Sequence, residues 1–294
     1  MATRYWQDVS SDFESTSNWS AATVPVTGDS FHVLSGSTGI LTTLDQSDQD
    51  FANITFGPEF VGPIGTATSP LKLGTLTGTI TINSPLADTI NLWPVGVGTV
   101  VVAACNNKTY ACHFYDGAIT SLYVTGGQQI RIGAGMVITT LHVIPNSLDT
   151  RVFIEQGAAV TTINQSNGTI YSSAGCTTYN GRGGLFRLQG DQTASVTTIN
   201  LNSEGNRFVV ENEGTSTTFA TVNAFKGVFQ LDTATAKTIT NGNCYLGGYI
   251  DLRRGKDTVT VSNALSVYGG QVWGTDNVST IAGVPDKISG NGLL

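Results

Sequence analysis

The sequence predicts an all-β protein built as a single-stranded, right-handed parallel β-helix, a solenoid whose short strands stack coil upon coil. Three observations predict this fold: the composition suits strands and turns, one short strand recurs about every 20 residues, and a second strand lies within most repeats. About twelve such coils fit in the 294 residues. The right-handed sense is expected from the chirality of parallel crossovers.

The composition favours strands and turns over helices. Charged residues make up 12% of the chain, about half of the usual share. The hydrophobic fraction is 40%, which is too high for a disordered chain. Threonine, valine and isoleucine suit a pleated surface, whereas the 35 glycines and the many asparagines suit turns.

The repeated strand is clearest in the middle of the chain. It reads VTTIN from Val160 and again from Val196, with ITTL from Ile138 and CTTY from Cys176. A fixed period of about 20 residues is typical of a solenoid, in which a coil buries its apolar face only by stacking on its neighbours. The aligned positions are Leu122, Leu141, Ile163, Tyr179, Ile199, Val222, Ile239, Val261 and Ile281, with weaker copies at Ile54, Ile80 and Val101.

The second strand of the repeat alternates its side chains between two faces. Examples are QIRIGAG from Gln129, RVFIEQG from Arg151, RFVVENEG from Arg207 and YIDLRRG from Tyr249. Such alternation indicates a strand with one buried face. The spacing of a leucine-rich repeat and the 3.6-residue period of helical repeats are both missing, which favours the β-helix.

Four asparagines follow the aligned residue in successive copies: Asn164, Asn180, Asn200 and Asn223. We expect them to form an inward ladder at a turn, where side-chain amides and backbone groups satisfy one another. The alternative is a set of four solvated turn residues.

The ends of a solenoid expose strand edges, so capping segments are expected. Residues 1–30 contain a dense aromatic cluster and are interpreted as an N-terminal cap or anchor, followed by one β-helix domain over 31–294. Residues 57–76 break the period with three prolines and predict a long loop or inserted turn. The tail from Ala282 is expected to cap the rod or to reach a partner.

The charge and the cysteines exclude several classes of function. A net charge of −7 and a pI of about 4.8 argue against a nucleic-acid partner. No apolar run is long enough to span a membrane, and the N-terminus lacks the features of a secretory signal, so synthesis in a cytoplasm is expected. The four cysteines form no CxxC motif, and with three histidines they predict no metal and no cofactor. Buried free thiols are favoured over a hairpin disulfide between Cys105 and Cys112.

The N-terminal stretch carries a family resemblance. It contains Trp6, the pair Asn18-Trp19, the pair Val24-Pro25 and the turn Gly28-Asp29 before a strand. This pattern resembles the start of many bacterial and bacteriophage β-helical proteins, including capsid decoration, head-fibre and tail components. The missing signal favours the phage group. The resemblance implies a virion structural protein, commonly a homotrimer, and carries over no catalytic residue.

Polysaccharide-cleaving enzymes also use β-helices, and they employ paired carboxylates or a base assisted by a cation. The second strands place Glu155, Glu211, Asp232 and Arg253 on an outward row, the last three in consecutive coils. Neighbours on that row would lie about 5 Å apart, roughly the separation in a retaining glycosidase. Glu211 and Asp232 are therefore the candidate catalytic pair. The competing interpretation is a solvated polar row in which Asp232 pairs with Arg253.

Two further charged segments are candidate binding sites. The cluster Asp251, Arg253, Arg254, Lys256 and Asp257 fits either a sulfated or acidic glycan or a solvated loop. The run DQSDQD from Asp45 has the wrong spacing for a calcium loop, so it is interpreted as a turn.

Apolar residues that face outward mark interaction surfaces. Phe153 and Val209 are expected to face out where their neighbours face in, and three rods packed side by side would bury them. The full set of interaction candidates is Trp6, Trp19, Phe153, Val209, Arg253 and Arg254.

The function expected from the sequence is a non-enzymatic bacteriophage structural protein. We expect a capsid decoration, or cement, protein on the virion surface, assembled in the host cytoplasm. It would form a homotrimer and bind the major capsid protein or another virion component. The alternative is a tail-spike or fibre-like protein that binds or degrades a host glycan.

Overall fold

A computed structural model describes residues 1–105, 111–190, 194–214, 217–255 and 259–274, together with the backbone at 280–281 and 288–289. About 61% of the chain is strand and 2% is helix. The fold is a β-solenoid of about 11 turns with roughly 21 residues per coil, which confirms the predicted fold class and period. Two compact units are resolved, Met1–Ala158 and Ala159–Leu294, and each is described by itself.

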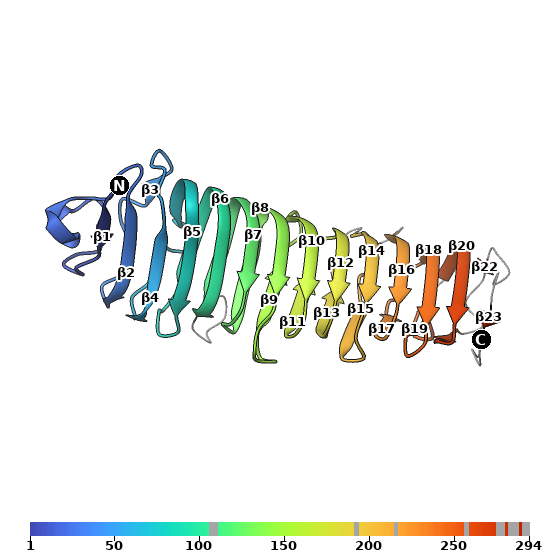
Figure 1. Ribbon diagram of the computed structural model, residues 1–294. Helices are drawn as coiled ribbons and strands as arrows, with labels where there is room; N and C mark the ends of the chain where they lie inside the picture. The colour runs from blue at the N-terminus through green and yellow to red at the C-terminus, as the bar shows by residue number, and fades with distance from the viewer. Residues whose placement is uncertain are drawn as a thin grey trace. The chain divides into compact units, whose positions relative to one another are not determined.

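Unit 1 contains four long strands, each of which runs through both strand segments of a repeat. For example, β8 includes QIRIG from Gln129 and ITTL from Ile138. Strands β4 to β9 pair in parallel, each with the next in the chain (Figure 1). The elements of unit 1 are β1 (Thr3–Tyr5), the 3-10 helices η1 (Thr16–Asn18) and η2 (Ser20–Ala22), β2 (Ser30–Gly36), β3 (Asp45–Gln46), β4 (Ile54–Phe60), β5 (Leu71–Ser84), β6 (Ile90–Cys105), β7 (Cys112–Val124), β8 (Gln129–Val143) and β9 (Arg151–Ile154).

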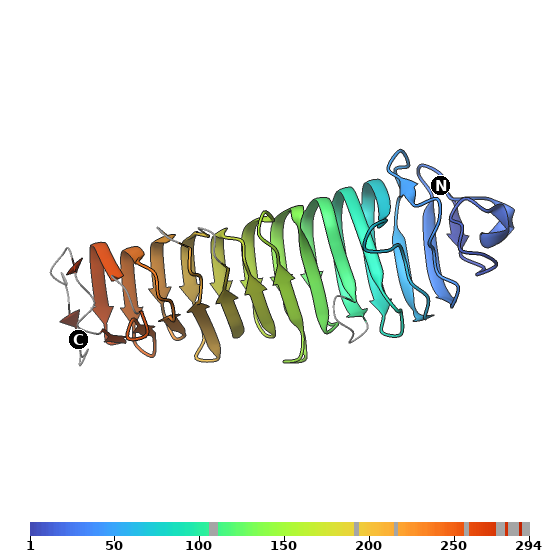
Figure 2. The same cartoon turned by 180° about the vertical axis from the view of Figure 1, so that it is seen from behind.

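Unit 2 separates the two strand segments of each repeat. The even-numbered strands from β10 to β20 form one parallel ladder, and the odd-numbered strands from β11 to β21 form a second (Figure 2). The strands are β10 (Ala159–Gln165), β11 (Thr169–Ser172), β12 (Cys176–Gly181), β13 (Gly184–Leu188), β14 (Val196–Leu201), β15 (Asn206–Val210), β16 (Thr217–Ala224), β17 (Val228–Leu231), β18 (Lys237–Tyr245), β19 (Tyr249–Asp251), β20 (Val259–Tyr268), β21 (Gln271–Trp273), β22 (Thr280–Ile281) and β23 (Ile288–Ser289).

The register confirms most of the predicted alignment. Ile163, Tyr179, Ile199 and Val222 are partners in successive strands. The alignment is wrong at Ile239, which pairs with Phe219, whereas Val222 pairs with Gly242. Ile239 and Gly242 are both buried positions of β18, and they lie on either side of a bulge in its pairing with β20. The sequence repeat alone does not show which of them is the partner of Val222.

The upstream alignment is wrong by one residue at one position. Leu122 pairs with Val100 rather than with Val101, and Val100 in turn pairs with Ile80. The burial pattern gives the reason, because Val100 is buried and Val101 is half-buried. A one-residue shift exchanges the inward and outward faces of a strand.

The interior of unit 2 contains a column of phenylalanines. The rings of Phe186 and Phe208 are stacked with centroids 4.6 Å apart, and those of Phe208 and Phe229 lie 5.9 Å apart. All three side chains are fully buried. Like residues stack on like because adjacent parallel strands are about 4.8 Å apart, so the repeat itself builds the core.

The asparagine ladder exists, but its predicted inward orientation is wrong. Each side-chain amide donates to the asparagine of the preceding coil, at 2.8–3.0 Å. The neighbours Ile163 and Gln165 on either side of Asn164 are buried, whereas Asn164 is half-buried, so the ladder lies on the outward face. It comprises Asn164, Asn180, Asn200, Asn223 and Asn243.

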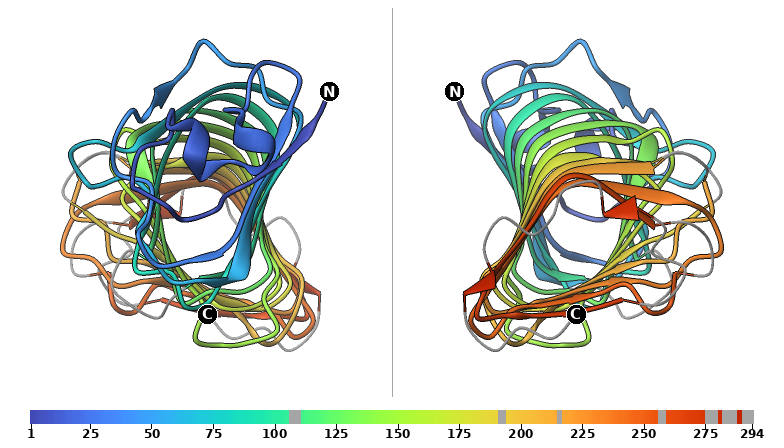
Figure 3. Two further views of the ribbon diagram at one scale, coloured as in Figure 1. Left: turned by 90° about the vertical axis from the view of Figure 1, so that its left-hand side faces the viewer. Right: turned by 90° about the vertical axis from the view of Figure 1, so that its right-hand side faces the viewer.

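The N-terminal segment packs its aromatic residues inward against the start of unit 1. Trp19 contacts the rings of Trp6, Phe13 and Phe31 at centroid distances of 5.0–5.5 Å, and its indole Nε1 donates to the Phe13 carbonyl at 2.6 Å. The left-hand view of Figure 3 shows η1 and η2 in front of the first coils of this unit. Trp6 and Trp19 are only 5% and 2% exposed, so these two interaction candidates lie in the core and not on the surface.

All four cysteines are free and buried, as the sequence predicts. Burial raises the pKa of the Cys105 and Cys244 thiols to about 11 and that of Cys176 to about 12. These thiols are therefore protonated and unreactive at neutral pH. None of the helices formed by the described residues has the length and apolar character needed to cross a membrane.

The predicted C-terminal tail is described in part. Ile281 of β22 pairs with Val261, and Ile288 of β23 pairs with Val267, both through the backbone of β20. The remainder of the tail from Ala282 lies outside the described residues.

Candidate functional site

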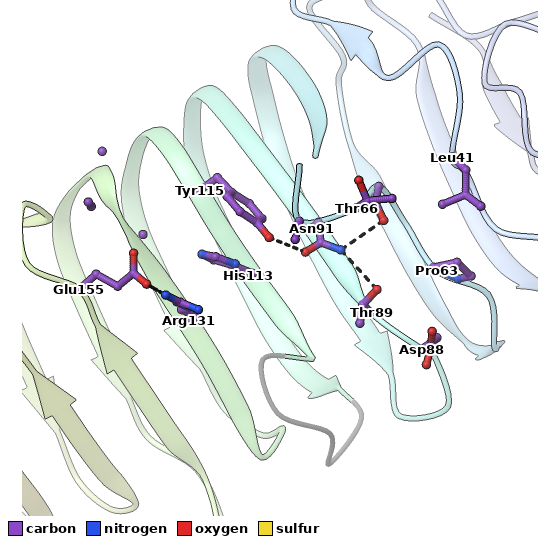
Figure 4. Close-up of a pocket in the computed structure, with 15 residues that line it drawn as sticks. Leu41, Pro63, Thr66, Asp88, Thr89, Asn91, His113, Tyr115, Arg131 and Glu155 are labelled. Atoms are coloured by element: carbon purple, nitrogen blue, oxygen red, sulfur yellow. Dashed lines mark hydrogen bonds and ion pairs between the residues drawn. The ribbon is translucent and has the colours of Figure 1, made fainter. Parts of the chain in front are cut away.

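A groove lies on the outward face of unit 1 and encloses a cavity of about 770 Å³. That volume falls within the usual range of ligand pockets. Figure 4 shows its side chains arranged across successive strands. The lining residues are Leu41, Pro63, Gly65, Thr66, Ala67, Asp88, Thr89, Asn91, His113, Tyr115, Arg131, Gly133, Ala134, Gly135 and Glu155.

The polar side of the groove is a row created by strand register. Asn91 on β6 pairs with His113 on β7, which pairs with Arg131 on β8. Each step along the row is about 4.8 Å, the spacing of neighbouring strands. The register partner of Arg131 on β9 is Phe153. Glu155, directly after β9 and two residues further along, forms an ion pair with Arg131.

The opposite wall comes from the segment between β4 and β5. The sequence predicted a loop over 57–76, but β4 extends to Phe60 and β5 begins at Leu71, so the irregular segment is 61–70. Ile64 in this segment forms parallel bridges to Ile40 and Ile90. The Asn91 amide donates to the carbonyls of Ile64 and Gly65 at 3.3 and 3.2 Å. The period break in the sequence thus builds one wall of the groove.

Glycine keeps the middle of the groove open. A Cβ on Gly133 would lie 2.5 Å from the Tyr115 carbonyl oxygen, and one on Gly135 would lie 2.5 Å from the Asp116 carboxyl carbon. A side chain at position 133 would require a shift of the neighbouring backbone, and one at position 135 would require the Asp116 side chain to move. The absence of side chains at these two positions leaves a hollow beside Tyr115.

His113 is the most unusual polar residue of the groove. It is 7% exposed, and its Nε2 is buried without a hydrogen-bond partner among the described residues. Its ring lies 3.6 Å from the Tyr115 ring, and the Tyr115 hydroxyl donates to the Asn91 side-chain oxygen at 3.0 Å. Burial and the nearby Arg131 guanidinium lower the pKa of His113 to about 4, so the imidazole is neutral at pH 7.

This burial predicts a pH dependence of stability. An unfolded histidine titrates near pH 6.5, whereas folded His113 titrates at about 4. The unfolded state therefore binds the proton first as the pH falls. The contribution of neutral His113 to the free energy of unfolding is fully present above about pH 6.5. It is lost progressively towards pH 4, by roughly 3 kcal/mol in total.

The measurement is urea unfolding at pH 7 and pH 4 for the wild type and for His113→Phe, which retains a ring against Tyr115. Between pH 7 and pH 4, the free energy of unfolding should fall by about 2–3 kcal/mol more in the wild type than in the variant. Equal losses in the two proteins would show that His113 does not carry the effect.

The structure pairs each proposed catalytic carboxylate with an arginine. Glu211 accepts from Arg187 at 2.9 Å and from the Gln189 amide at 2.7 Å, and Asp232 pairs with Arg254 at 3.4 Å. Both carboxylates follow adjacent strands of the second ladder in unit 2, whereas Glu155 lies in unit 1. Neither Glu211 nor Asp232 lines the groove.

The two predicted apolar interaction residues are not prominent on the surface. Val209 is on the outward side of β15, yet it is only 4% exposed, and its register partners are the long side chains of Arg187 and Gln230. Phe153 is half-buried and lies opposite Arg131 in the register. The expectation that Val209 forms an exposed flank is therefore wrong.

The predicted basic residues Arg253 and Arg254 are exposed, and each forms an ion pair with an aspartate. Arg253 makes two hydrogen bonds of 2.9 Å to Asp251 and lies 4.4 Å above the Trp273 ring. Asp232 is bound by Arg254 rather than by Arg253. Lys256 and Asp257 of the same predicted cluster lie outside the described residues.

Of the groove residues, the sequence predicts only Glu155, as a member of an outward row, and it does not predict the apolar surface described below. Asn91, His113 and Arg131 come from three coils, and only the register shows that they are neighbours. The period break over 57–76 is the sequence signal for the opposite wall. One apolar surface of unit 2, which we call the apolar strip, comprises the exposed Phe225, Leu246 and Tyr268 and the half-buried Tyr245 between them.

Within the described part of the chain, no group of three or more histidine, cysteine, aspartate or glutamate side chains is placed to hold a metal ion. Comparison with models of protein families, with curated proteins and with solved structures gives no match to this chain.

Proposed function

We propose that this chain is a non-enzymatic structural component of a bacteriophage particle, a capsid decoration protein that associates as a homotrimer. The observation that carries the proposal is the apolar strip, in which three stacked aromatic rings lie beside an exposed leucine. The N-terminal resemblance and the self-supporting stack of coils also support it. A stack of hydrogen-bonded coils makes a stiff scaffold, because each coil is held by its neighbours.

The apolar strip is continuous over three coils. The rings of Phe225, Tyr245 and Tyr268 are stacked at 4.7 and 5.0 Å, and Leu246 beside them is 76% exposed. These residues follow or end β16, β18 and β20, at equivalent positions of the repeat. Ordered apolar surface of this kind is typical of an interaction site.

A second copy of the chain suits the strip better than a charged partner. The chain carries a net charge of −7, so copies repel one another except where an uncharged surface meets another. Closed cyclic symmetry buries equivalent strips without leaving one unpaired. We therefore assign the trimer contact to the strip rather than to Phe153 and Val209.

Leu246→Glu should dissociate the assembly. Three added carboxylates would be brought together and removed from water, which opposes association. The matched control is Leu148→Glu in unit 1, because Leu148 is 74% exposed and lies outside the strip.

Light scattering over a concentration series checks this prediction. The midpoint of association should move at least tenfold higher in concentration for Leu246→Glu and should not change for Leu148→Glu. An unchanged midpoint in Leu246→Glu, or equal shifts in both variants, would rule out the strip as the contact.

The groove in unit 1 favours a second candidate, a tail-spike or fibre-like protein that binds a host glycan. Its enzymatic form would use Glu211 and Asp232 as a catalytic pair. Both carboxylates already bind arginines, Glu211 to Arg187 and Asp232 to Arg254, and neither lines the groove. We therefore prefer binding without cleavage for this candidate.

A further inference from the structure

The groove of unit 1 has the shape of a site for a linear ligand. Its polar row crosses β6, β7 and β8 at Asn91, His113 and Arg131, so that it follows the stacking direction of the coils. From Asn91 to Arg131 this amounts to two steps of about 4.8 Å, and Glu155 of the next coil adds a carboxylate through its ion pair with Arg131. Figure 4 shows the wall of residues 63–66 and Leu41 extending the groove beyond Asn91.

One polar group beneath the groove lacks a hydrogen bond. Nearly all buried polar groups in folded proteins have a partner, and an exception requires a reason. Asn91 is satisfied by Tyr115 and by the carbonyls of the opposite wall. His113, its neighbour in the row, is more than nine-tenths buried and keeps Nε2 unpaired among the described residues. A ligand that completes this bond would remove the desolvation cost of the orphan group.

The charges of the groove disfavour an anion. The described lining residues include one guanidinium, Arg131, and two carboxylates, Asp88 and Glu155, and Arg131 is already paired with Glu155. His113 contributes no charge at neutral pH. An acidic or sulfated ligand would meet no excess of positive charge, so an uncharged ligand is favoured.

The remaining lining combines hydrogen-bonding groups with apolar walls. Tyr115, Thr66 and the Arg131–Glu155 pair offer both donors and acceptors, whereas Leu41 and Pro63 are apolar. A sugar ring has the matching character, with hydroxyls around its edge and C–H groups on its faces. Sites that hydrogen-bond hydroxyl groups reject analogues that lack them.

We propose that this groove binds a neutral oligosaccharide lengthwise, with Arg131, Glu155 and Tyr115 meeting its hydroxyls and His113 beneath them. The inference deepens the glycan-binding candidate and rests on it. It is independent of trimer formation, so that a failed binding assay and a failed mass measurement can be told apart.

The test is calorimetric titration of the full chain with maltotriose, cellotriose and N,N′,N″-triacetylchitotriose, and with trigalacturonate as an acidic trisaccharide of equal length. Ala134→Trp fills the groove from an exposed position without changing the polar row. Val137→Trp is the matched control, because Val137 lies on the same strand, is 51% exposed and does not line the groove.

We expect at least one neutral trisaccharide to bind more tightly than trigalacturonate. Ala134→Trp should weaken that binding at least tenfold, and Val137→Trp should leave it unchanged. Arg131→Gln should also weaken it, whereas His142→Ala, which removes a histidine stacked on Tyr123 outside the groove, should not. Failure of all three neutral sugars, tighter binding of the acidic sugar, or binding that Ala134→Trp leaves unchanged would each overturn the proposal.

Discussion

Phe208→Ala is expected to destabilise unit 2 by about 3–5 kcal/mol, the usual loss when a fully buried phenylalanine is truncated. Phe208 lies between Phe186 and Phe229 in the aromatic column, and its ring also contacts Tyr179 at 5.1 Å. The cavity would open in the middle of the column, where coils on both sides are fixed by the hydrogen-bonded ladders. The packing around it therefore has little freedom to collapse.

Urea unfolding followed by circular dichroism measures this loss. Phe208→Leu is the conservative control, since it keeps most of the apolar volume and should lose about 1.5 kcal/mol or less. If alanine and leucine at position 208 unfold at the same urea concentration, the aromatic column is not a principal source of stability.

Trp19→Ala is the second change with a large expected effect, about 3–5 kcal/mol on unit 1. It removes an indole that contacts Trp6, Phe13 and Phe31 and that donates to the Phe13 carbonyl. Loss of the N-terminal packing would also expose the edge of β2. A free strand edge pairs readily with other chains, so the variant should aggregate on mild heating.

The matched control is Trp93→Ala in the same unit. Trp93 is half-buried on β6, and its ring lies 5.3 Å below the Lys72 ammonium. Its removal should cost about 1 kcal/mol or less, because such an exposed cation–π contact is weak. Equal losses of stability in the two variants, without aggregation of Trp19→Ala, would contradict a capping role for residues 1–30.

The repeat predicted the fold because stacking constrains every coil in the same way. A large apolar or aromatic residue recurs in each repeat because it must fill the same inward position, as Ile163, Tyr179 and Ile199 do. The prediction failed where that constraint weakens. The structural partner of Val222 is Gly242, which has no side chain to mark the inward position. The sequence repeat instead matches Val222 with the apolar Ile239, three residues earlier.

Whether a polar side chain points into or out of the solenoid is harder to predict than the fold. An asparagine ladder satisfies its own amides on either face of a strand, so the sequence did not distinguish an inward Asn200 from an outward one. The prediction that Trp6 and Trp19 are surface interaction residues is also wrong. Trp6 and Trp19 pack against each other across a single antiparallel bridge that no repeat reveals.

The groove was not predictable because it depends on register between distant residues. His113 appears in the sequence as a lone histidine, and only the pairing of β6, β7 and β8 places it between Asn91 and Arg131. The apolar strip is equally hidden, since Phe225, Tyr245 and Tyr268 come from three different repeats of the sequence. In both cases the chemistry arises from the stack and not from a local motif.

The mass of the purified chain in solution tests the proposed structural role most directly. Light scattering at low and high salt should give about 92 kDa, three times the 30.8 kDa of one chain. High salt should not dissociate the trimer, because the contact assigned to the apolar strip is uncharged. A mass of 30.8 kDa at every concentration and salt condition would contradict the proposal.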